Sequence, residues 1–153
     1  MEGQDRFLLP SYIEETVRPH ALGRFEDLLI ATAQSPAMLV YLDNVQSVTP
    51  GSRPPIPPRA MGRMNAEQRA QLEQRMPRGL NENYARELQE LHTLGVDGGY
   101  TQQDVMEVPR ILTGWGTRRP ALGVGFEFHD WAHDRGAETA LGVAFPAGRG
   151  MDE

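Results

Sequence analysis

The N-terminal third of the chain alternates apolar and polar positions with a helical period. Leu22, Phe25 and Leu29 recur on one face, which predicts an amphipathic helix ending near Ala33. Ser35-Pro36 is typical of an N-cap followed by proline at the first helical position, so a further helix is expected through Leu42. Before these, Ser11 and Glu14 fit a capping box, which predicts a short helix up to Val17 that Pro19 ends.

The middle of the chain begins with a proline-rich stretch at 47–62 and continues with a polar helix. Proline at this density cannot donate to a helix or sheet, so this stretch is interpreted as an extended, flexible loop within a single domain rather than as a domain boundary. Asn65 is the expected cap of the helix that follows, over 66–76.

The stretch 82–94 is the best-defined predicted helix, with Asn81 as N-cap and Gly95 as the residue after its C-terminus. Tyr84, Leu88 and Leu91 are expected to form its core stripe. Thr101 with Asp104 predicts the start of a further helix, in which Pro109 should produce a kink. The residues of that helix expected to be buried are Val105, Met106, Ile111 and Leu112.

The C-terminal sequence is rich in glycine and contains two short alternating runs, 125–129 and 139–145. Alternation of this kind predicts strands, and a β-hairpin across the intervening loop is expected, with Phe126, Phe128, Leu141, Val143 and Phe145 on its buried face. The predicted fold is mainly α: an irregular bundle of about five to six helices with a small C-terminal β-hairpin.

Composition excludes several classes of protein and site. The net charge is −6, and no basic stripe suited to nucleic acid is found. Cysteine is absent, which excludes disulfides and cysteine-based zinc sites. No apolar run approaches the ~18 residues of a membrane span, and the N-terminus has no signal-peptide pattern.

Polar residues beside the core stripe of the 82–94 helix are the first candidate site. Asn83, Glu87 and Glu90 are expected to share one edge, where they could hold a divalent cation or provide a general base. Glu82 and Arg86 have the spacing of a surface ion pair. The competing interpretation is that all these groups cap, pair and stay solvated.

His133 and Asp134, in the loop after the first predicted strand, complete the candidate set. Histidine next to aspartate can ligate a metal or form an acid–base pair, although such residues are also common turn formers. The secondary candidates are His92, Arg86, His129 and Asp130. No common hydrolase, nucleotide-binding or zincin signature occurs.

Several segments resemble one bacterial family, the domain of unknown function 1800. They are RPHALGRFEDLLIATAQSPAMLVYLDN (18–44), RGLNENYARELQELHTLGVDGGYTQQDV (78–105), LTGW (112–115) and FEF…HDRGAETALG (126–142). The resemblance implies a largely helical, exported protein without an established reaction, often encoded beside a sulfatase- or phosphatase-like companion. It also implies that residues 1–153 are a partial domain, the middle of a longer one.

Two positions depart from the family pattern. Glu138 stands where the family motif has lysine, which argues against an anion-binding role for that position. Pro109 stands where an uninterrupted helix is expected. Both departures fit a gene fragment or a gene copy under relaxed selection.

Three functional hypotheses follow. The preferred one is a non-enzymatic binding or scaffold module acting with a partner, either the companion protein or the remainder of a full-length family domain. The alternative is a metal-dependent hydrolase-like site built from the 82–94 helix and the 129–138 loop, for which the sequence selects no metal. The third is that the chain alone is incompletely folded, exposes an apolar face intended for the missing parts of the domain, and self-associates.

Overall fold

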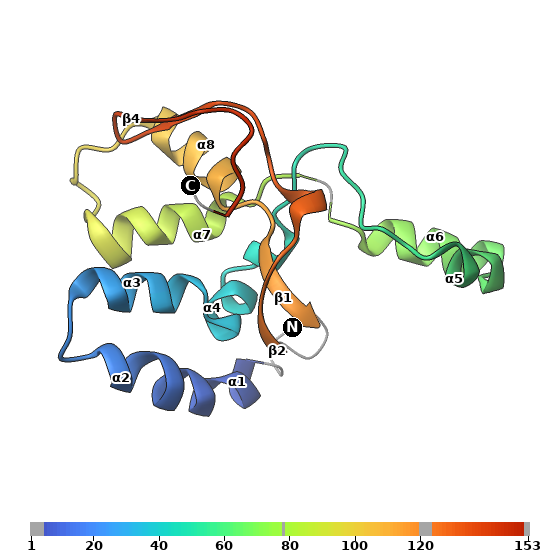
Figure 1. Cartoon of the computed structure of the whole chain (residues 1–153), viewed down its shortest axis with the longest axis horizontal. Coiled ribbons are helices and arrows are strands. Elements are labelled where there is room, and N and C mark those ends of the chain that lie inside the picture. Colours follow the sequence, from blue (N-terminus) through green and yellow to red (C-terminus); the bar gives the residue numbers. More distant parts are fainter. Residues whose placement is uncertain (1–4, 78, 120–123, 152–153) are drawn as a thin grey trace.

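The computed structural model describes residues 5–77, 79–119 and 124–151, and it is mainly α, as the sequence predicts. Two layers of N-terminal helices lie beneath a pair of helices from later in the chain, and a β-ribbon crosses the middle of the molecule (Figure 1). The lower layers are α1 (Asp5–Ser11), α2 (Arg18–His20), α3 (Phe25–Ala33) and α4 (Pro36–Tyr41). The upper pair is α7 (Glu82–Glu87), with its π-helical continuation η3 (Leu88–Thr93), and α8 (Gln102–Ile111).

The first helix differs from its prediction. It begins at Asp5 and continues through the π-helical segment η1 (Tyr12–Val17) and α2 to His20, so Ser11 lies inside it and does not cap it. The Ser11 hydroxyl donates to the Leu8 carbonyl oxygen at 3.0 Å instead. Pro19 does not end the helix, because it stands in the first turn of α2, where its missing N–H is tolerated. The next helix starts at Phe25, and Leu22 is fully exposed before it.

Local capping signals elsewhere are confirmed. Ser35 and Pro36 start α4, which ends before Asp43, a residue with φ of 58°. Asn65 forms a reciprocal capping box with Gln68 at the start of α6 (Ala66–Arg75), and Thr101 forms one with Asp104 at the start of α8. These motifs involve neighbouring residues only, so sequence alone identifies them.

The proline-rich stretch is extended only as far as Pro57. A helix, α5 (Pro58–Arg63), then begins with proline at its first position, so the prediction of an extended segment up to Gly62 is wrong. With α6, it forms a projection that stands away from the rest of the molecule (Figure 1). The start of the stretch is tightly held, since Val48 is buried and donates to the Gly79 carbonyl oxygen at 3.1 Å.

The 82–94 helix has its predicted ends, but its second half winds differently. The Leu94 N–H bonds to the Gln89 carbonyl oxygen five residues back, at 2.9 Å, as in a π-helix. A wider turn rotates later residues away from the earlier stripe. Leu91 is therefore 72% exposed, and the core positions are Tyr84, Ala85 and Gln89, so the prediction for Leu91 is wrong.

The core joins α3, α4, α7 and α8 to the C-terminal hairpins. Its central buried side chains are Leu39, Tyr84, Val108 and Leu112. Met106 of α8 is 45% exposed, contrary to prediction, because Val105 and Val108 occupy the inward face.

The strands form two separate hairpins, so the predicted pairing of 125–129 with 139–145 is wrong. β1 (Trp115–Arg119), which the sequence analysis missed, pairs antiparallel with β2 (Val124–Phe128). β3 (Glu138–Ala140) pairs with β4 (Val143–Phe145) across the turn Leu141-Gly142, where both residues have positive φ. The inward positions of β3 are Glu138 and Ala140, whereas Leu141 and Val143 are exposed.

Candidate functional site

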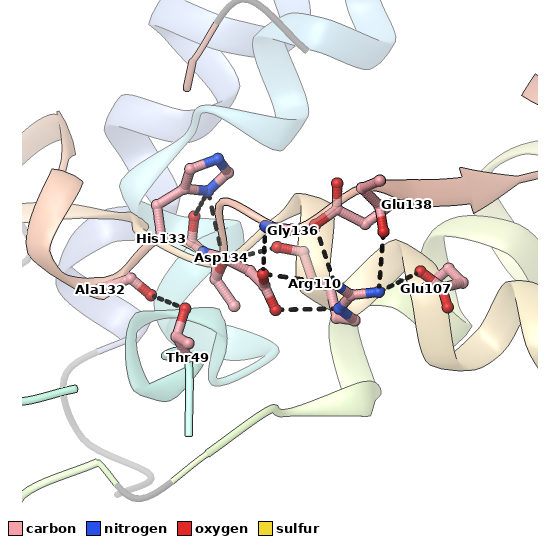
Figure 2. A network of polar contacts seen from close by, with 10 residues as sticks. Thr49, Glu107, Arg110, Ala132, His133, Asp134, Gly136 and Glu138 are labelled. Atoms are coloured by element: carbon pink, nitrogen blue, oxygen red, sulfur yellow. Dashed lines mark hydrogen bonds and ion pairs between the residues drawn. The ribbon is translucent and has the colours of Figure 1, made fainter. Parts of the chain in front are cut away.

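Arg110, in the last turn of α8, is the centre of the densest polar network among the described residues (Figure 2). Its guanidinium lies 2.7 Å from a Glu107 carboxylate oxygen, 3.0 Å from Asp134 and 3.5 Å from Glu138. The network therefore ties α8 to the loop before β3 and to the first residue of β3.

The chain forms this network by combining a helical spacing with a tight turn. Glu107 and Arg110 are three residues apart on α8 and so share a face. The Asp134 carboxylate accepts the Gly136 N–H at 2.8 Å, and the Thr113 hydroxyl accepts the Asp134 N–H at 2.7 Å. A Cβ on Gly136 would lie 2.5 Å from an Arg110 nitrogen, so a larger residue there would displace the guanidinium.

The positive charge of Arg110 is more than balanced by the three carboxylates around it. The Arg110 guanidinium donates to Asp134 and lowers the pKa of that carboxyl, and the same hydrogen bond raises the pKa of Arg110. Glu138 contributes a third carboxylate, whose side chain is completely enclosed. Three acids around one arginine repel an incoming anion, so the network is suited to holding structure rather than to binding an anionic substrate.

His133 is buried beside the network, but its ring points to a different partner. Its Nδ1 lies 2.9 Å from the Thr113 carbonyl oxygen, and its ring packs edge-on against Phe128 at a centroid distance of 5.0 Å. Asp134 is bonded to Arg110. The two neighbours both contact Thr113, but the Asp134 carboxylate bonds to Arg110 whereas the His133 Nδ1 faces the Thr113 carbonyl oxygen.

The other half of the predicted site, on the 82–94 helix, has its own contacts. Glu90 accepts from the Tyr100 hydroxyl at 2.9 Å and lies 3.4 Å from Arg86. Arg86 also lies 3.6 Å from Glu82, which confirms that predicted ion pair. Asn83 is exposed, and its side-chain nitrogen donates to the Leu42 carbonyl oxygen at 3.4 Å. Glu87 lies at the end of α7 and is partly exposed.

The described residues, 5–77, 79–119 and 124–151, contain no group of three or more His, Asp or Glu side chains placed to hold a metal ion. The contacts of Asn83 and Glu90 are with α4, α7 and the Tyr100 turn, whereas those of His133 and Asp134 are with α8 and the β1 region. The structure thus places the two halves of the predicted site in two separate networks.

The secondary candidates also lie in separate environments. His92 lines a small, largely apolar hollow of about 160 Å³ with Tyr12 and Phe25. The His129 Nε2 lies 3.2 Å from the Thr117 carbonyl oxygen. Asp130 pairs with Arg135 at the surface.

Sequence reasoning missed Arg110, the residue that organises the network. Glu107 and Arg110 have the spacing of a helical ion pair, which the sequence analysis did not assign. No local pattern connects either residue with Asp134, which lies 24 positions after Arg110. The sequence analysis expects a lysine at the position of Glu138. The structure explains why a carboxylate is accommodated there, since Arg110 lies beside it.

Comparison with known proteins identifies the relatives of the chain. The family described as "Protein of unknown function (DUF1800)" matches residues 1–153. The chain belongs to the DUF1800 family. Neither a curated protein nor a solved structure matches this DUF1800 chain. No helix among its described residues is both long and apolar enough to cross a membrane.

Proposed function

We propose that this DUF1800 chain is a non-enzymatic binding or scaffold module of an exported bacterial protein, and that it docks on a partner protein through its N-terminal helices. One observation carries the proposal: large apolar side chains are concentrated on the surface of these helices. Six of the 15 exposed large hydrophobic residues among those described lie between residues 7 and 30. They are Phe7, Leu9, Ile13, Leu22, Phe25 and Ile30.

The exposed fractions indicate surface that a partner would cover. Phe7 is 85% exposed and Phe25 61% exposed, although each is an aromatic side chain whose burial is strongly favourable. Apolar surface concentrated in this way is typical of protein–protein contacts, in which aromatic residues serve as anchors. The Arg110 network supports the non-enzymatic role, because its charged groups are paired with one another.

Two partners are proposed: the sulfatase- or phosphatase-like companion protein, and the remainder of a full-length DUF1800 domain. The companion is the one that can be tested directly, because it can be purified as a separate protein.

The test is the affinity of the purified companion for wild-type chain and for Phe25→Glu, measured by isothermal titration calorimetry. We expect wild type to bind with a Kd below about 100 μM and Phe25→Glu to lose at least about tenfold. Val143→Glu is the matched control, since Val143 is comparably exposed at 56% but lies on β4. Equal loss in both variants, or no binding by wild type, would contradict docking of the companion on these helices.

The alternative function is a metal-dependent hydrolase-like site that joins the 82–94 helix with the 129–138 loop. It requires Glu87 and His133 to act on one ion. Titration with Zn²⁺, Mn²⁺, Ca²⁺ and Mg²⁺ separates the two proposals. A rise in Tm that Glu87→Gln and Asp134→Asn both abolish would favour the metal site.

A further inference from the structure

The segment from Pro54 to Met76 forms an arm that projects from the body of the molecule (Figure 1). Its elements, α5 and α6, make no extensive contact with any other described helix or strand. The arm holds itself together, because Arg69 donates to the Met61 carbonyl oxygen at 3.0 Å and Arg53, just before the arm, lies 3.5 Å from Glu73.

The base of the arm is fixed, so its direction is set by the body. Ser47 and Gly79 form a parallel β-bridge where the chain leaves and returns. The Thr49 N–H also donates to the Ala132 carbonyl oxygen at 2.8 Å. The projection is anchored at both ends, and none of its residues is buried.

That inner surface is an apolar groove of about 610 Å³ between the extended stretch and α6. Its apolar lining includes Ile56, Met61, Leu72 and Met76. Methionine side chains are flexible and polarizable, and they adapt to apolar partners of irregular shape. Arg53 and Arg69 stand among the lining residues.

The charge of the arm is opposite to that of the rest of the chain. Residues 53–76 contain five arginines and two glutamates, which gives them a net charge of +3. Because the whole chain has a net charge of −6, the remaining residues carry −9. Charges of opposite sign on two surfaces favour their encounter and suppress wrong partners. The remainder of the chain therefore carries charge of the sign opposite to that of the arm.

One part of the body combines acidic and exposed apolar groups. Leu91 and Val96, at the end of η3 and in the following turn, are 72% and 71% exposed. Glu87 is the last residue of α7, directly before η3, and Asp97 follows Val96 directly. The π-helical winding that turns Leu91 outward creates this surface.

We propose that the arm binds a second copy of this chain, with its groove covering the surface formed by Glu87, Leu91, Val96 and Asp97. Arg53 and Arg69 then face Glu87 and Asp97 of the neighbouring copy. The contact joins two different surfaces and uses none of the N-terminal docking residues, so its failure leaves the proposed function intact.

Sedimentation velocity of the full chain over about 1–200 μM tests the proposal. We expect the mass to rise above the 17.1 kDa of the monomer, and to rise less at high salt because exposed charges are screened. Arg53→Glu/Arg69→Glu and Glu87→Arg/Asp97→Arg should each weaken association at least about tenfold, because each places like charges across the contact. Arg59→Glu/Arg63→Glu is the matched control, with the same charge change on arm residues that do not line the groove.

Mixing the two groove-contact variants is the decisive step. The intact arm of the body variant then meets the intact body surface of the arm variant, and the reversed arm meets the reversed body surface, so association should return. A wild-type chain that stays monomeric throughout overturns the proposal. So does equal weakening by the control variant, or a mixture that fails to associate. The body variant also tests the contact independently of arm folding, since its substitutions lie outside the arm.

Discussion

The Arg110 guanidinium lies 3.5 Å from the enclosed carboxylate of Glu138. The pair joins the last turn of α8 to the first residue of β3. Asp134 and Glu107 complete the set around the same cation (Figure 2). The C-terminal hairpin is thus attached to the helical core by charge as well as by the packing of Ala140.

Arg110→Met should destabilise the fold strongly, because it removes the cation that lies 3.5 Å from the enclosed Glu138 carboxylate. Removing one partner of a buried ion pair costs about 3–5 kcal/mol. Urea unfolding followed by circular dichroism measures the effect. Glu138→Gln in the Arg110→Met background should recover part of the loss, since the buried charge is then gone. Additive losses in the double variant would show that the two residues are not coupled.

Asp134→Asn should reduce the acid sensitivity of the protein. The Arg110 hydrogen bond lowers the folded-state pKa of Asp134, so between that value and the ordinary pKa of about 4 the unfolded state binds more protons. The stability that Asp134 contributes is present above about pH 4 and is lost as the pH falls through the folded-state pKa. Free energies of unfolding measured from pH 6 to pH 2 should therefore fall less steeply in the variant. An unchanged slope would contradict this role of Asp134.

Leu141→Asn should stabilise the β3–β4 hairpin. Leu141 has φ of 52°, a left-handed conformation that costs a branched side chain about 1–2 kcal/mol. Asparagine tolerates this conformation, and Asn-Gly is the preferred two-residue hairpin turn. We expect a gain of about 1 kcal/mol in thermal unfolding. Val143→Asn, at an exposed strand position, is the control and should give no gain.

Asp104→Ala should cost more than Thr101→Ala, although both remove the same capping box. Asp104 also accepts the Leu141 N–H at 2.6 Å, which connects the start of α8 to the hairpin turn. Loss of the cap alone costs about 1 kcal/mol. Equal destabilisation of the two variants in chemical unfolding would show that the bond to Leu141 contributes little.

The helical part of the fold was largely predictable, because its signals are local. Asn65, Asn81 and Thr101 all cap the helices that the sequence assigns to them. A cap bonds to residues two or three positions away, so its geometry is specified before the chain folds. The exception is Ser11, where a capping pattern lies inside a longer helix that packing against α3 and α4 extends.

The strand partners and the site were not predictable in the same way. Apolar and polar residues alternate well over 139–145, yet the chain folds back on itself at Leu141-Gly142. The buried positions of the first strand, β3, are Glu138 and Ala140. The sequence alone determined most of the helices, the caps at Asn65, Asn81 and Thr101, and the family. The tertiary structure decided that Asp134 meets Arg110 and that Leu91 faces outward. The reason is that these outcomes depend on segments distant in sequence and on how a helix winds against its neighbours.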